Sequence, residues 1–123
     1  PLQRMLNAVE PGSYIQPHKH ENPDKTEVFI ILRGKLAVIV WDEAGLHPRA
    51  IVLTPGGENL AVEIPPRTWH MIASLETGTV VYEIKNGPWD PHTDKIFAPW
   101  APNESDPEAV SYLNQILENL KLK

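Results

Sequence analysis

Along most of the chain, short segments rich in apolar residues alternate with polar segments that contain turn residues. The apolar-rich segments cover residues 27–32, 35–41, 49–53, 60–64, 70–75 and 79–85. Strands of this length, spaced roughly eight to twelve residues apart, are typical of an antiparallel sandwich or barrel. Residues 2–9 alternate loosely and predict an edge strand or a strand given to a partner subunit. Residues 14–20 predict a strand that Pro17 interrupts.

The run from Glu27 to Leu32 is apolar at every position after the glutamate. A strand with one solvated face should instead alternate apolar and polar residues. If Glu27 points inward, Phe29 and Ile31 do so too, and the residues between them need another cover. A second sheet or a second subunit would supply that cover, which makes a homodimer our hypothesis.

The segment 86–105 is punctuated by proline and contains Trp89 and Trp100. Large aromatic side chains favour burial, and long segments without regular structure are uncommon in compact domains. We therefore expect an ordered strap that covers the barrel and buries its aromatic rings.

Apolar residues recur at helical spacing in the last part of the chain. Ser105 and Glu108 have the spacing of a capping box, which predicts a helix start beside them. The patterns together predict one domain over 1–123, with a barrel over about 2–85, then the strap, then one amphipathic α-helix over about 106–120.

Charge and composition exclude several classes of function. The 123 residues carry a formal net charge of -5 and no run of lysine or arginine, so neither nucleic acid nor an anionic membrane is an expected partner. No segment has the length of a membrane span or a secretory signal, and a cytoplasmic location is expected. The absence of cysteine excludes disulfides, thiolate metal ligands and a cysteine nucleophile.

Two histidines separated by one residue, His18 and His20, would point to the same side of a strand. Glu27 follows at the start of the next strand, and His70 begins another apolar segment after a proline turn. Neutral imidazoles and a carboxylate suit one divalent transition metal such as zinc, iron, manganese or nickel. The sequence therefore predicts a metal site made by His18, His20, Glu27 and His70.

These residues resemble the first motif of the cupin superfamily, G-x5-H-x-H-x(3,4)-E-x6-G. Gly12 and the two histidines match its first half, and Glu27 with Gly34 matches its second half. Six residues separate His20 from Glu27, instead of three or four, and this longer loop leaves Glu21 as an alternative ligand.

Pro65 and His70 keep the spacing of the second cupin motif, G-x5-P-x-G-x2-H-x3-N. Arg67 replaces its glycine and Ser74 its asparagine. The resemblance implies an all-β, cupin-type antiparallel barrel or jelly roll (a double-stranded β-helix), here with one C-terminal helix.

The chain is also similar to the WbuC family of cupin-fold metalloproteins. This similarity rests on Gln3–Asn7, on Lys85–Pro91 and on Phe97–Pro102. The family resemblance implies a bound metal and a link to surface-polysaccharide biosynthesis and other sugar chemistry, without a settled reaction.

Several other side chains are candidates for binding or catalysis. Arg67 could bind an anionic group of a substrate, or simply be a solvated turn residue. Tyr82 and Glu83 are adjacent on a predicted strand, so only one of them faces the interior, and that one is a candidate catalytic acid or base. Asp90, His92 and Asp94 in the strap could form a lid over the site, although surface polar residues in a loop are the more ordinary interpretation.

We expect a metal-dependent enzyme that acts on a small molecule, such as a sugar or sugar nucleotide, by isomerisation or epimerisation. With iron, the same ligands would allow an alternative dioxygenase chemistry. A non-catalytic metal- or sugar-binding module is a further alternative, and a purely structural metal is a third. The fold alone does not separate these functions.

Overall fold

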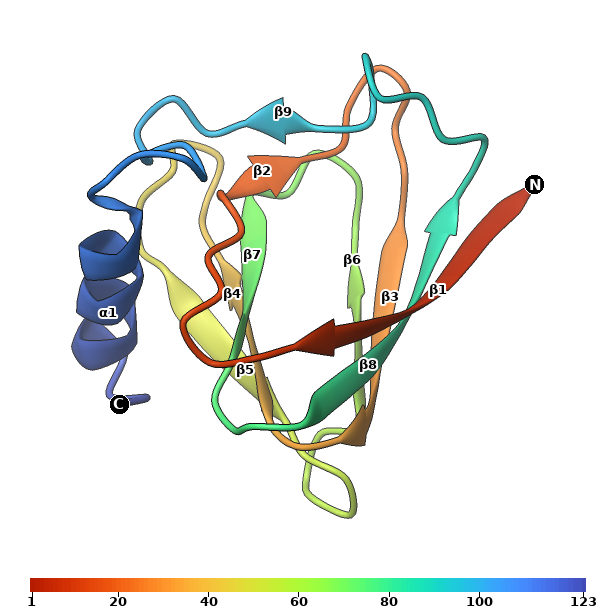
Figure 1. Cartoon of the computed structure of the whole chain (residues 1–123). Coiled ribbons are helices and arrows are strands. Elements are labelled where there is room, and N and C mark those ends of the chain that lie inside the picture. Colours follow the sequence, from red (N-terminus) through yellow and green to blue (C-terminus); the bar gives the residue numbers. More distant parts are fainter.

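The computed structural model describes all residues from 1 to 123 and consists of two antiparallel sheets with one helix at the C-terminal end (Figure 1). The four-stranded sheet has the order β1 (Leu2–Val9), β8 (Thr79–Asn86), β3 (Glu27–Arg33), β6 (Ala61–Ile64). The five-stranded sheet has the order β5 (Arg49–Leu53), β4 (Leu36–Val40), β7 (His70–Ser74), β2 (His18–Lys19), β9 (Ile96–Phe97). The single helix is too short and too polar to cross a bilayer.

The inner faces of the two sheets form the main core. Because strand side chains alternate, β3 sends Phe29 and Ile31 into this core. The facing positions Val38 of β4 and Val81 of β8 are fully buried there. Burial of such side chains contributes most of the favourable free energy of folding, about 1.5–3 kcal/mol for each.

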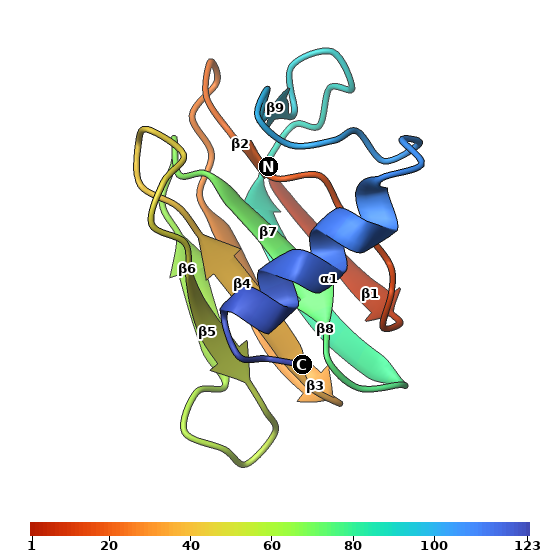
Figure 2. The ribbon, with the colours of Figure 1, turned by 90° about the vertical axis from the view of Figure 1, so that its left-hand side faces the viewer.

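The helix α1 (Ala109–Asn119) covers the outer face of the five-stranded sheet (Figure 2). All five residues of β4 are buried, since one set packs in the main core and the other set, Ala37 and Ile39, packs under the helix. Leu113 and Leu117 of the helix fill this second core. A strand covered on both faces explains why the sequence of β4 is apolar throughout.

The structure confirms the two-sheet architecture and the C-terminal helix and corrects several details. The strand expected over 14–20 is only two residues long, and the strap contains a short strand, β9, that pairs with β2. The helix begins at Ala109, after Glu108, and no side chain caps it. The capping-box prediction was therefore wrong.

The expectation that the strap buries its aromatic rings is also wrong in part. Trp100 packs against Trp41, with ring centroids 5.0 Å apart, but Trp89 is 56% exposed. β1 is an edge strand, as one of the two sequence alternatives predicted.

Candidate metal centre

Four buried side chains from both sheets converge at one end of the barrel. His18 of β2 and His70 of β7 are directly paired across the five-stranded sheet, and His20 follows β2 on the same side. Glu27 reaches them from the first position of β3 in the other sheet. One side-chain donor atom of each residue lies within 4.8 Å of all the others, so this cluster could bind a metal ion.

The orientation of the three imidazoles is fixed by main-chain carbonyl groups. Nδ1 of His18 donates to the carbonyl of Gln16 at 2.8 Å, and Nδ1 of His70 donates to that of Thr68 at 2.8 Å. Nδ1 of His20 donates to the carbonyl of Asp94, which comes from the strap. A neutral imidazole carries only one N–H, so all three Nε2 atoms are left with a lone pair.

The arrangement of the Nε2 atoms fits a cation. Nε2 of His20 and Nε2 of His70 lie 2.8 and 2.9 Å from the same oxygen, Oε1 of Glu27. Without a cation, both rings would have to be doubly protonated to donate to it, although they are buried beside a third imidazole. A metal among these atoms accepts every lone pair at once, and carbonyl contacts at the other ring nitrogen are typical of metal-bound histidine.

The protonation states agree with a metal-ligand set. Burial, together with the neighbouring His70, lowers the pKa of His18 to about 3, so this ring is neutral at pH 7. Burial by itself would raise the pKa of Glu27, but in the absence of a metal the hydrogen bonds from His20 and His70 hold it well below its usual range. Glu27 is therefore ionised, as a carboxylate ligand must be.

A cavity of about 410 Å³ opens beside the cluster, and His18, Glu27 and His70 form part of its wall. Glu83 of β8 lines the same cavity and accepts a hydrogen bond of 2.8 Å from Nδ2 of Asn7 on β1. Burial and the nearby Glu27 raise the pKa of Glu83 above its usual range. A volume of this size lies within the range of small-molecule sites.

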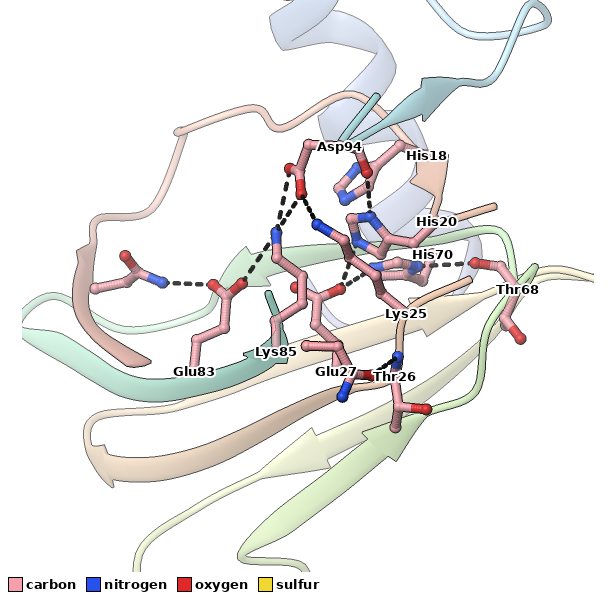
Figure 3. Close-up of polar contacts among 12 residues, drawn as sticks. His18, His20, Lys25, Thr26, Glu27, Thr68, His70, Glu83, Lys85 and Asp94 are labelled. Atoms are coloured by element: carbon pink, nitrogen blue, oxygen red, sulfur yellow. Dashed lines mark hydrogen bonds and ion pairs between the residues drawn. The ribbon is translucent and has the colours of Figure 1, made fainter. Parts of the chain in front are cut away.

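A second buried polar cluster connects the strap to the metal centre (Figure 3). The carboxylate of Asp94 lies 3.0 Å from Nζ of Lys85 and 3.6 Å from Nζ of Lys25. These three residues are at most 5% exposed. Nζ of Lys25 also donates to the carbonyl of Pro88 at 2.9 Å. Asp94 thus holds both lysines with its side chain and His20 with its main chain.

The four predicted ligands lie in one cluster, whereas the other candidate residues lie outside it. Glu21, the alternative to Glu27, pairs with Lys19 at 3.2 Å and is not part of the cluster. Tyr82 lies on the outer face of its strand, because its neighbour Glu83 faces the cavity. Arg67 lies on an exposed turn and pairs with Asp24 at 3.1 Å, away from the cavity lining.

Of the three strap residues that could have formed a lid, only Asp94 lies at the site. His92 and Asp90 are exposed, while Asp94 is buried and Trp89 lines the mouth of the cavity. Asn7 and Lys25 were also missed, and no local pattern marks them. Lys85 could have been found, because it lies two residues after Glu83 on one strand and so shares its face.

Comparison with known protein families and curated sequences gives one partial match. Residues 1–53, less than half of the chain, match a family model described as a domain of unknown function, DUF6016. No curated protein has a matching sequence.

Among solved structures, the capsular polysaccharide assembling protein CapF from Staphylococcus aureus matches with a TM-score of 0.66 and 26% identity. The match covers 77% of this chain but only 26% of CapF, so the chain spans about a quarter of that protein. A dTDP sugar isomerase from Desulfovibrio desulfuricans matches with a TM-score of 0.66 and 18% identity, over 87% of this chain and 68% of the isomerase.

The dTDP-4-dehydrorhamnose 3,5-epimerase from Bacillus anthracis has a TM-score of 0.64 and 17% identity, over 87% of this chain and 62% of the epimerase. Identities this low establish only a shared fold. That fold agrees with the sheet order and the C-terminal helix described above. The chain therefore has a cupin-type jelly-roll fold with one C-terminal helix, and it contains a buried cluster of three histidines and one glutamate that could bind a metal.

Proposed function

We propose that this protein is a metal-dependent cupin enzyme of the WbuC type that isomerises or epimerises a small sugar derivative, in the context of surface-polysaccharide or sugar-nucleotide metabolism. His18, His20, Glu27 and His70 hold one divalent transition metal. When bound, such an ion polarises a carbonyl or hydroxyl group of a ligand. The observation that carries the proposal is the cavity beside the cluster, which a second carboxyl group, Glu83, also lines.

Glu83 is the candidate acid or base in this proposal. Isomerisation or epimerisation beside a carbonyl requires a group that removes a proton from carbon and a group that returns one. The Glu83 carboxyl faces the cavity, and the amide of Asn7 fixes one of its oxygens at 2.8 Å. Tyr82 is a weaker candidate, because its side chain is on the other face of β8.

The relatives support the ligand class. The proteins with this fold include a sugar isomerase and a sugar epimerase that act on dTDP sugars, and CapF assembles a capsular polysaccharide. We accordingly propose a small sugar derivative as the ligand. We also propose that the protein is a homodimer and that it is cytoplasmic. Arg67 would bind an anionic part of the ligand only if that part extends out of the cavity to the exposed turn of Asp24.

Elemental analysis of protein purified without an affinity metal tests the metal site. We expect near-stoichiometric metal in the wild type and its loss in the double variant His18→Ala with His20→Ala. The matched control is His47→Ala with His92→Ala, which removes two exposed histidines outside the cluster and should keep the metal. A wild type that stays metal-free after reconstitution with divalent ions would overturn the metal site.

Proton exchange tests the reaction. Incubation with a panel of 4-keto sugar nucleotides in deuterium oxide should incorporate deuterium next to the carbonyl, as followed by NMR. Glu83→Gln should abolish incorporation and keep the metal, whereas Glu58→Gln, at an exposed position, should change neither.

The identity of the metal and the deuterium exchange together also distinguish the alternative functions. Stoichiometric iron without exchange would favour an iron-dependent dioxygenase. Another metal, with ligand binding but no exchange, would favour a non-catalytic binding module.

A further inference from the structure

The outer face of the four-stranded sheet is apolar and has no cover. The only helix packs on the five-stranded sheet (Figure 2), and no element lies outside β1, β8 and β3 (Figure 1). Two leucines on this face, Leu2 and Leu6, are 60% and 66% exposed. The alternate positions of β3 that point away from the core, Val28 and Ile30, are only partly buried. An apolar sheet face of this kind marks an interaction surface.

Two oppositely charged residues, Arg4 and Glu63, lie on this face at the same level along the strand direction. The register pairs Arg4 with Ile84, Ile84 with Val28, and Val28 with Glu63. These four residues therefore form one row across β1, β8, β3 and β6, with the charges at its two ends. Strands are about 4.8 Å apart, so roughly 14 Å separates the two ends of the row.

Neither charged side chain forms an ion pair within its own chain. Arg4 and Glu63 are exposed, and neither has an ion-pair partner in the structure. The apolar centre of the row and its two unlike ends make the face complementary to a second copy of itself.

We infer that the outer face of the four-stranded sheet is a homodimer interface whose two-fold axis runs parallel to the strands. A rotation about such an axis, placed between β8 and β3, lays β1 of one copy over β6 of the other and keeps each row at its height. Arg4 then meets Glu63 of the second copy, twice in each dimer, and Ile84 faces Val28 of the second copy. A homodimer with this self-complementary contact is isologous.

An axis perpendicular to the strands, placed through the same row, gives a different contact. It would lay β1 over β1 and bring Arg4 to Arg4 and Glu63 to Glu63. Like charges at both ends of an apolar interface are unfavourable, which selects the parallel axis. Pairing through the free edge of β1 would leave Glu63 far from the contact, because β6 is the opposite edge of the sheet.

This inference specifies the surface and symmetry of the homodimer included in the proposed function, and it does not depend on the metal. In the dimer, β6 of the second copy would cover β1, the edge strand that carries Asn7 into the cavity. Dimerisation would therefore support the wall of the cavity that holds Glu83.

Sedimentation equilibrium with charge-reversed variants tests the inference. The wild type should be a dimer at about 50 µM. Arg4→Glu and Glu63→Arg should each raise the dimer dissociation constant by about tenfold or more, since each creates two like-charged pairs. The variant with both substitutions should return to within about threefold of the wild type. Arg49→Glu and Glu58→Arg, at exposed positions off this row, are the matched controls.

A monomeric wild type at this concentration would overturn the inference, as would dimers that neither single reversal weakens. Single reversals that weaken the dimer without rescue by the double variant would refute the parallel axis. Metal content, measured on the same samples, keeps this test separate from the proposed function. A metal-free wild type that dimerises with charge rescue supports the interface while the metal site fails.

Discussion

Replacing Asp94 by asparagine removes the carboxylate that two buried lysines share. Lys25 and Lys85 are 2% and 4% exposed, and their Nζ atoms lie 3.6 and 3.0 Å from Oδ1 of Asp94. Asparagine has nearly the same size and leaves the main-chain carbonyl that accepts from His20 in place. The substitution therefore tests the charge of the cluster and not its packing.

The structure sets the expected magnitude. Removal of one partner from a buried ion pair costs about 3–5 kcal/mol. The lower end applies here, because Lys25 keeps the carbonyl of Pro88 at 2.9 Å and Lys85 keeps Glu83 at 3.9 Å. Unfolding entropy of about 2.1 cal/mol/K per residue gives roughly 0.26 kcal/mol/K for this chain. A loss of about 3 kcal/mol then lowers the unfolding midpoint by about 12 °C.

Thermal unfolding of metal-free protein, followed by circular dichroism, is the assay. The control is Asp24→Asn, which removes an exposed ion pair with Arg67 and should leave the midpoint almost unchanged, because solvent screens that pair. The strap should also open, so trypsin should cleave after the exposed Lys95 faster in the Asp94 variant. A midpoint within about 4 °C of the wild type, or no lower than that of the control, would refute the reasoning.

Three further predictions concern the fold and the metal. Gly34→Ala should lower the unfolding free energy by about 2–4 kcal/mol, because φ is +82° and the added Cβ would clash with the main chain of a neighbouring strand. Gly56→Ala, with φ +70° and open space around it, should lose only about 1–2 kcal/mol in the same urea titration. Leu113→Ala should cost about 2–5 kcal/mol by leaving a cavity under the helix, whereas the exposed Val110→Ala should stay within about 0.5 kcal/mol; equal losses would contradict the packing. Adding the native divalent ion at about 100 times its Kd should raise the thermal unfolding midpoint of wild-type protein stripped of metal by a chelator by about 10 °C. The same addition should not change the midpoint of the double variant His18→Ala with His20→Ala.

The architecture could be predicted because strand side chains alternate. The apolar run from Glu27 to Leu32 has one set of positions in the core, as its pattern predicted, whereas no second sheet covers the other set. The spacing of His18 and His20 likewise placed both rings on one side of the chain. Short periodic patterns determine which face a residue occupies, and the candidate metal cluster follows from them.

The start of the helix could not be predicted from spacing alone. The side chain of Asn103 accepts from the backbone N–H of Ser105, and that of Asp106 accepts from the N–H of Glu108. These local turns take up the groups that a capping box would have used, and the helix starts only at Ala109.

Contacts between distant parts of the chain left no local signal. Lys25 and Asp94 are 69 positions apart, and each reads as an ordinary polar residue in its own segment. Lys25 lies in the longer loop between His20 and Glu27, and this loop places it against the strap. An insertion relative to a motif thus carried a structural role that the motif itself does not describe.

The three carbonyl acceptors of the histidines differ in when they become available. His18 and His70 use carbonyls two residues earlier in the chain, but His20 uses that of Asp94, 74 residues later. During synthesis, all four candidate ligands leave the ribosome before the strap does. A nascent chain that ends before residue 94 would carry every candidate ligand and still lack the contact that orients one of them, so the strap completes the candidate metal centre last.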